Sequence, residues 1–231
     1  MVRGTRRCIA GSIALAAVVA SIAGCSKSAP GSDQAQVRRG LHAIEGIPQD
    51  GFTLGRPQAP WTLTVISDAT SYELDQLITL LPALVTNFVR PGSMKLQLRT
   101  PSIGAYAGNG DERAAASALL AAGLQRRYWN AVARFVPTYR GRLSDADVKT
   151  LLQRSGVPDV SRAMAERSSP RVRAALARAD AAAATAVAAF PATLGGGRVV
   201  YLLTHGDQAP RNVTADVYVG QLIEVLDATL R

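Results

Sequence analysis

Apolar residues recur with two different periods along the chain, and the change of period marks the predicted elements. Trp61–Ser67 ("WTLTVIS") is a β-branched run bounded by Asp68, which is typical of a buried strand. Residues 74–88 carry apolar side chains at helical spacing, and Pro82 is expected to kink this helix. Residues 94–100 ("MKLQLRT") alternate, as in a second strand. Strand, helix and strand in this order predict a βαβ unit.

The middle of the chain carries only helical patterns. Three helices are predicted, over residues 111–136, 145–155 and 170–189, with N-caps at Asp111, Ser144 and Ser169. Asp147, three residues after Ser144, suits a capping box, and Gly156 closes that helix. The third helix is rich in alanine, whose side chains bury little area, so we expect these helices to pack on the sheet.

The end of the chain returns to a strand pattern. The three glycines at 195–197 predict a hairpin turn, which leads into the apolar run "RVVYLLT". A last helix is expected from about Thr214. The full order, βαβ, helices, ββα, indicates one elaborated α/β domain.

The N-terminal segment "MVRGTRRCIAGSIALAAVVASIAGC" joins three basic residues to an apolar run of about 16 residues, too short for a span of about 20. Its end, "SIAGC", resembles the bacterial lipoprotein signal, although Ile22 stands where leucine is commoner. The resemblance implies that residues 1–24 are removed and that Cys25 carries two acyl chains, which suffice for stable membrane anchoring. An ordinary secretory signal and a retained transmembrane anchor are the alternatives.

Residues 25–40 are polar without apolar periodicity, and this predicts a flexible tether before a domain at 41–231. The formal net charge is +9, and it falls to +6 without the three arginines of the first segment. This charge suits attraction to an anionic membrane surface. No nucleic-acid partner is expected, because the aromatic residues do not interleave with basic ones.

Three stretches, "LGRPQAPWTLTVISD", "AAGLQRRYW" and "AAFPATLGGGR", stand in the order and spacing found in one family. Over roughly residues 46–230 the chain resembles the DsbA-like family. The resemblance implies a thioredoxin-like fold with an inserted helical subdomain at about 111–189. It places Pro191 at the family's cis-proline position, preceded by Phe190 where threonine or valine is usual.

The family carries C-x-x-C at a helix N-terminus, where the thiolate is stabilised and the second cysteine resolves a mixed disulfide. The corresponding residues here are Ser71, Tyr72, Glu73 and Leu74. Cys8 lies in the segment predicted to be removed, and a lipidated Cys25 has no free thiol. We therefore expect no disulfide oxidoreductase activity.

The polar residues of "SDATSYELDQL" need no chemistry to explain them. Asp68, Glu73 and Asp75 match no metal-ligand spacing, so neither a metal nor a cofactor is expected. Thr70 and Glu73 fit the T-x-x-E capping box of the following helix. His42 and His205 are interpreted as surface loop residues.

Two functions remain open. The favoured hypothesis is a redox-inactive, lipid-anchored domain on the extracytoplasmic face of the bacterial cell envelope, which binds a peptide or partner protein through the former active-site groove. The alternative is a glutathione-binding transferase or isomerase of the kappa type, in which Ser71 holds the thiolate. The arginines of the insert are expected to form a solvated helix face rather than a site for an acidic partner or lipid headgroups: Arg126, Arg127, Arg162, Arg167, Arg171, Arg173 and Arg178.

Overall fold

The computed structural model describes residues 30–102, 111–138, 143–189, 199–214 and 221–230 of the chain. The strands are β1 (Gln49–Asp50), β2 (Thr53–Leu54), β3 (Trp61–Ser67), β4 (Met94–Arg99), β5 (Val199–His205) and β6 (Arg211–Asn212). The helices are α1 (Pro30–Ala43), α2 (Tyr72–Leu84), the π-helix η1 (Val85–Val89), α3 (Asp111–Gly123), α4 (Tyr128–Thr138), α5 (Asp145–Arg154), α6 (Val160–Glu166), α7 (Pro170–Ala189) and α8 (Leu222–Leu230).

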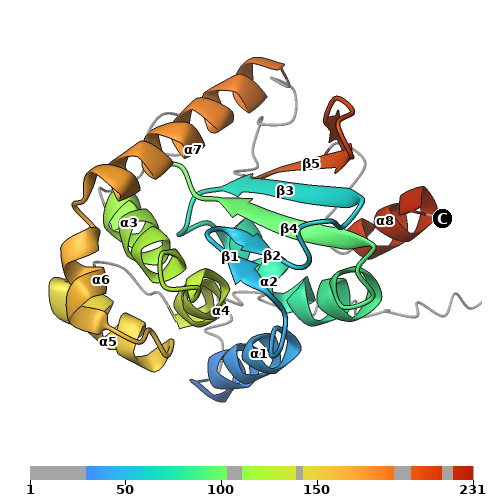
Figure 1. The fold of residues 1–231 in the computed structure, drawn as a ribbon. Helices are drawn as coiled ribbons and strands as arrows, with labels where there is room; N and C mark the ends of the chain where they lie inside the picture. The colour runs from blue at the N-terminus through green and yellow to red at the C-terminus, as the bar shows by residue number, and fades with distance from the viewer. Residues whose placement is uncertain (1–29, 103–110, 139–142, 190–198, 215–220, 231) are drawn as a thin grey trace, which may run out of the picture.

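One mixed sheet with the strand order β1-β2-β4-β3-β5-β6 lies at the centre (Figure 1). β3 pairs in parallel with β4 and antiparallel with β5. The predicted βαβ unit is confirmed as β3, α2 and β4, with β3 at its predicted bounds. Helices α3 to α7 lie between β4 and β5 in sequence, so the predicted helical insert is present.

Strand alternation directs one set of side chains to the face of the sheet on which α2 and α8 pack. Val65 of β3 and Leu98 of β4 belong to the main buried cluster with Leu77 of α2 and Leu226 of α8. Pro82 lies inside α2, and the π-turns of η1 begin three residues later. Proline has no N–H for the i−4 bond, which is why irregular turns follow such residues.

The predicted helix over residues 111–136 is two helices. α3 ends at Gly123, and α4 starts at Tyr128 after a turn in which Arg126 has a φ of 59°. Glycine is a poor helix former, and a left-handed residue cannot continue a helix. The change of direction brings Trp129 onto the β1–β2 hairpin, where its Nε1 donates to the carbonyl of Phe52 at 3.1 Å. Apolar residues keep their helical spacing from α3 into α4, so the sequence pattern did not reveal the break between the two helices.

The predicted tether is wrong from residue 30 onward, because residues 30–43 form α1. Val37, Gly40 and Ile44 are buried at helical spacing, and a Cβ on Gly40 would touch that of Ala133 of α4 at 3.4 Å. One buried position is a glycine, so the periodicity of apolar residues does not reveal this helix.

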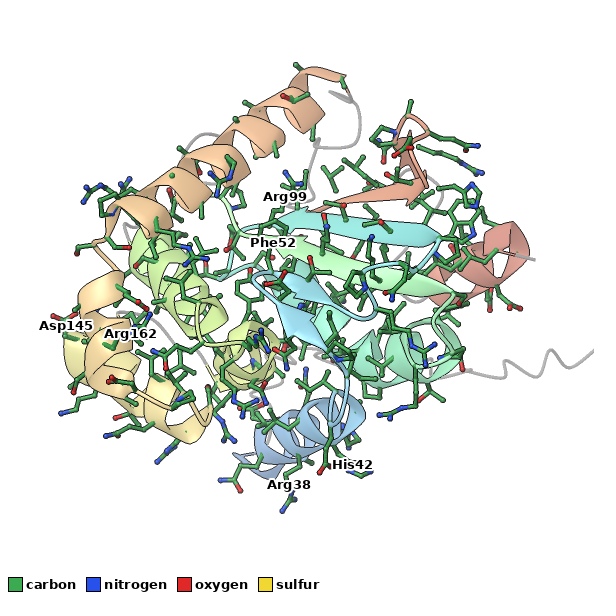
Figure 2. The ribbon with its side chains drawn as sticks, in the orientation of Figure 1. Arg38, His42, Phe52, Arg99, Asp145 and Arg162 are labelled. Atoms are coloured by element: carbon green, nitrogen blue, oxygen red, sulfur yellow. The ribbon has the colours of Figure 1, made fainter. Side chains whose placement is uncertain are left out.

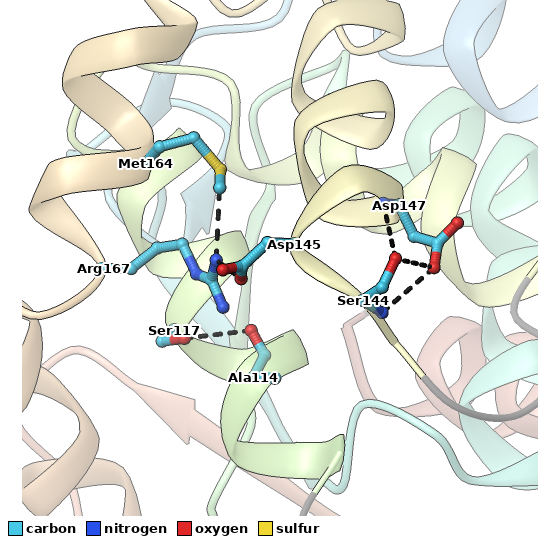
Figure 3. Close-up of polar contacts among 7 residues, drawn as sticks. All are labelled: Ala114, Ser117, Ser144, Asp145, Asp147, Met164 and Arg167. Atoms are coloured by element: carbon cyan, nitrogen blue, oxygen red, sulfur yellow. Dashed lines mark hydrogen bonds and ion pairs between the residues drawn. The ribbon is translucent and has the colours of Figure 1, made fainter.

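The predicted caps of the insert are confirmed where they can be compared. Ser144 and Asp147 form the complete capping box of α5 (Figure 3). Gly156 follows that helix with a φ of +70°. The backbone N–H of Val172 donates to Ser169 Oγ at 3.2 Å, which caps α7.

Several predictions fall on residues outside the described part. These are the signal segment 1–24, Cys25, Phe190, Pro191 and the glycines at 195–197. The last helix is described from Leu222, and Thr214 itself lies in a bend. Among the described residues, no helix combines the length and the hydropathy that a membrane crossing needs.

Candidate functional site

The four positions that the resemblance aligns with C-x-x-C, residues 71–74, lie where β3 ends and α2 begins. Ser71 is the N-cap of α2, with extended backbone angles, and its Oγ accepts a hydrogen bond from the N–H of Leu74 at 3.1 Å. Leu74 is fully buried, Glu73 is half-buried and Tyr72 points out. Ser71 and Leu74, the first and fourth of these positions, are therefore joined by a hydrogen bond across the first turn of α2.

The capping box predicted for Thr70 and Glu73 is wrong, because Asp68 engages Thr70. Both the N–H and the hydroxyl of Thr70 donate to Asp68 Oδ1, each at 2.9 Å. An aspartate that binds the backbone two residues on forms an Asx turn. This turn moves the start of the helix one residue further, so the capping role passes to Ser71.

Ser71 also takes part in a buried hydroxyl pair. Its Oγ lies 2.7 Å from Ser67 Oγ, and Ser67 Oγ is also 3.4 Å from the carbonyl oxygen of Asp68. Ser67 is inaccessible, and Ser71 is 5% exposed. The Ser71 hydroxyl is thus engaged by the helix backbone and by Ser67, and both interactions point into the protein.

A carboxylate from the helical insert joins this site. Glu112 of α3 is 5% exposed, and its Oε1 lies 3.5 Å from Thr70 Oγ1. Forty-two residues separate the two in sequence, and the sequence analysis did not find Glu112. The one feature of the sequence that could have indicated Glu112 is its place as an acidic residue at the start of a predicted helix.

Across the described residues, no group of three or more His, Cys, Asp or Glu side chains is placed to hold a metal ion.

Tyr201 of β5 is a second residue that the sequence analysis missed. Its side chain is 1% exposed, and no residue in the described part of the chain forms a hydrogen bond with its hydroxyl. Burial raises the pKa of Tyr201 above its usual range, and the negative charge of Glu73 raises it further. The phenol is therefore neutral. The alternation of β5 could have placed Tyr201, because it shares a face with Leu203 and that face packs on α2.

Tyr72 is the part of the site that solvent and partners can reach. Its side chain is 70% exposed, and none of the other large apolar side chains in the described segments is classed as exposed. The preceding buried residues Asp68, Ser67 and Ser71 support the turn that holds it. The site therefore presents the exposed ring of Tyr72 next to the buried polar side chains of Ser67, Asp68 and Ser71.

Neither histidine is a base for Ser71. His205 ends β5 and its ring lies 4.5 Å from that of Trp61, at the opposite end of β3. Seven extended residues place that end roughly 20 Å from Ser67. His42 lies in the last turn of α1, 3.5 Å from Glu45. Both were predicted to lie in loops, and both belong to regular elements instead.

Several insert arginines bond within the insert. Arg162 pairs with Glu166 at 2.8 Å, and Arg167 pairs with Asp145 at 2.7 Å (Figure 3). Arg127 Nε donates to the carbonyl of Gly156 at 3.0 Å, and Arg173 donates to that of Ser168. These four side chains are thus engaged within the insert, and the solvated helix face stays a prediction.

Replacing Ser71 with alanine is expected to lower the free energy of unfolding by about 1 kcal/mol, because the N–H of Leu74 loses its acceptor. Urea denaturation followed by circular dichroism measures this change. The control is Ser71→Thr, which keeps a capping oxygen and should lose less. An unchanged stability in Ser71→Ala would show that the hydroxyl does not cap α2.

Comparisons with known proteins find structural matches alone. No protein-family model and no curated protein matches the sequence. BdbD from Bacillus subtilis (oxidised) matches with a TM-score of 0.57 and 12% identity, over 81% of this chain and 97% of that one. MdbA, a thiol-disulfide oxidoreductase from Corynebacterium diphtheriae, matches with 0.55 and 15%, over 80% and 98%. A periplasmic thioredoxin-like protein from Salmonella enterica serovar Typhimurium matches with 0.53 and 15%, over 83% and 95%.

These matches span nearly the whole length of each solved structure. The chain has the α/β thioredoxin-like fold with the helical insertion of DsbA structures, as the sequence predicts. The structural superpositions establish the fold. Sequence identities of 12% and 15% do not establish a shared activity, which has to be judged from the chemistry of the site.

Proposed function

We propose that this chain is a redox-inactive, DsbA-like lipoprotein of the bacterial cell envelope that binds a peptide or partner protein at the N-terminus of α2. One observation supports this most strongly. In a fold whose relatives include a thiol-disulfide oxidoreductase, the first turn of α2 carries Ser71 and Leu74 and no sulfur. Disulfide exchange requires a thiolate that attacks and a second thiol that resolves, and a hydroxyl supplies neither.

The binding part of the proposal rests on Tyr72. Tyrosine is enriched among the residues that dominate binding energy, since its rigid ring buries much area and its hydroxyl finds a partner. Its 70% exposure on a capped helix presents the ring without further rearrangement.

The envelope location rests on the N-terminal sequence. The proposed mature chain starts at Cys25, whose two acyl chains hold it to the membrane on the extracytoplasmic face. The periplasmic thioredoxin-like relative is in keeping with such a location. Intact-mass analysis of the protein from envelopes should show loss of residues 1–24 and a lipid-sized increment.

A photoreactive residue in place of Tyr72 tests the binding proposal in cells. Crosslinking followed by mass spectrometry is expected to capture one predominant envelope protein or peptide. The matched control places the same residue at Lys149, which is exposed on α5. Equal products from both positions would contradict a binding site at α2.

Two solution assays test the absence of redox and thiol chemistry. The native chain should match buffer in an insulin reduction assay, and turnover would contradict redox inactivity. Titration calorimetry with glutathione should give no heat. Saturable binding that Ser71→Ala weakens would favour the kappa-type alternative instead.

A further inference from the structure

The sheet has a second face, opposite α2, whose composition changes along the strands. Its side chains are Thr62, Thr64 and Ile66 of β3, Lys95, Gln97 and Arg99 of β4, and Val200, Leu202 and Thr204 of β5. The β3–β4 pair is parallel and the pairs on either side of it are antiparallel, and antiparallel pairs can leave one face to solvent or to a ligand. At one end of this face Ile66 lies between Val200 and Arg99, and at the other end Thr62 lies between Thr204 and Lys95.

Helix α7 packs on Ile66 and Val200, and the polar residues of this face line a groove beside the helix. Ala183 and Ala186 of α7 form a small buried cluster with Ile66 and Val200. Beyond it lies a groove of about 590 Å³ between the helix and the strands. Its lining is Thr62, Thr64, Ile66, Lys95, Gln97, Arg99, Ala182, Thr185, Ala186, Ala189, Leu202, Thr204 and Pro210. This volume falls in the range of small-molecule sites.

The groove has an apolar wall and a cationic side. The wall consists of alanines at successive turns of α7 with Ile66 and Leu202, whereas the charged lining residues are Lys95 and Arg99. No carboxylate belongs to this lining. A ligand that complements it has an apolar body and a negative group.

Arg99 marks the place for the negative group. Its guanidinium lies 5.5 Å from the centre of the Phe52 ring, between the strands and α7 (Figure 2). Its Nε is buried and has no hydrogen-bond partner among the described residues. Lys95, by contrast, already donates to the carbonyl of Pro57 at 2.6 Å. Of the two charged residues that line the groove, Arg99 therefore has more hydrogen-bond donors that no described residue occupies.

Arg178 of α7 adds a second positive charge there. Both arginines line an adjoining cavity of about 80 Å³. Burial lowers the pKa of Arg99 and the charge of Arg178 lowers it further, so the pair is close enough to repel. In the described segments neither makes an ion pair, and nearby Asp180 accepts from the N–H of Ser102 at 2.6 Å.

We propose that this groove binds an amphipathic carboxylate, with its head at Arg99 and Arg178 and its apolar body along the alanines of α7. A carboxylate there relieves the repulsion between the arginines and accepts charge-assisted hydrogen bonds from their guanidinium groups. The body packs against Ile66 and Leu202 of the sheet. The site is on the opposite face from Tyr72 and is independent of the function proposed above.

Calorimetry with three probes of matched structure tests the ligand class. The chain from residue 25 onward contains every element that the structure describes, and Cys25→Ser removes any acyl chain of its own. Dodecanoate below its micelle concentration is expected to bind saturably. Dodecylamine, which has the same tail and the opposite charge, and butanoate, which has the same head without the tail, should not. Equal binding of dodecylamine, or no binding of dodecanoate, would overturn the proposal.

Paired variants on α7 test the position of the site. Thr185→Trp fills the groove and should abolish dodecanoate binding, whereas Ala184→Trp, on an exposed neighbouring position outside the lining, should not. Arg178→Gln should weaken binding roughly tenfold through loss of a charge-assisted bond. Arg171→Gln, an exposed arginine of the same helix, should change it less than twofold. Thermal unfolding checks that each variant is folded, and equal effects within either pair would refute the site.

Discussion

Replacing Trp129 with alanine is expected to lower the free energy of unfolding by about 3–5 kcal/mol, the usual cost of removing a buried aromatic side chain. Trp129 of α4 is fully buried in the main cluster, where the insert meets the sheet. Its Nε1 donates to the carbonyl of Phe52, and its backbone N–H donates to Gln49 Oε1 at 3.0 Å. The substitution leaves a cavity and removes the indole's donor to Phe52.

Urea denaturation of the chain from residue 25 onward measures this effect. Trp129→Phe is the first control, because it keeps most of the packed ring and loses the donor, and should cost less. Trp61→Ala is the second, because Trp61 is half-buried at the edge of β3. A loss below about 1 kcal/mol in Trp129→Ala would show that the α4–hairpin contact is not part of the folded core.

The double substitution Ser71→Cys and Leu74→Cys is expected to give the chain the ability to reduce insulin, at least tenfold above the native chain. The N–H of Leu74 already points at the side-chain atom of residue 71. A thiolate at that place accepts the same bond and lies at the positive end of α2, and both effects lower its pKa. The spacing of two residues then lets the second thiol resolve a mixed disulfide.

Each single variant is the control for the double variant, because one thiol cannot complete the cycle. Leu74 is buried, so its replacement also costs stability, and the assay is read only on protein shown to be folded by circular dichroism. A folded double variant without activity would show that the turn at α2 no longer supports thiol chemistry. Activity only in the double variant would show that the sulfur atoms alone were missing.

The core strands and the caps of the insert could be predicted because each depends on neighbouring residues. β3 is bounded by Pro60 and Asp68, and the Ser144–Asp147 capping box closes within one turn. The break after Gly123 and the helix α1 could not, since both depend on contacts with distant segments. Trp129 reaches the carbonyl of Phe52, and Gly40 approaches Ala133.

At the candidate site, the sequence located the four positions and misjudged the cap. Thr70 and Ser71 are both good capping residues, and sequence cannot choose between them. The choice depends on Asp68, which is buried and binds Thr70. Glu112 and Tyr201 enter the site from an inserted helix and another strand, so no local pattern joins them to it.

The sequence by itself determined the order of the core elements and, through the family resemblance, the thioredoxin-like fold, because periodicity and residue identity are properties of the chain. Only the tertiary structure decided that Ser71 caps α2 and points inward while Tyr72 is exposed. It alone revealed the groove beside α7 and brought Arg99 and Arg178, 79 positions apart in the chain, to one adjoining cavity. The physical reason is that burial and charge pairing depend on which distant segments meet.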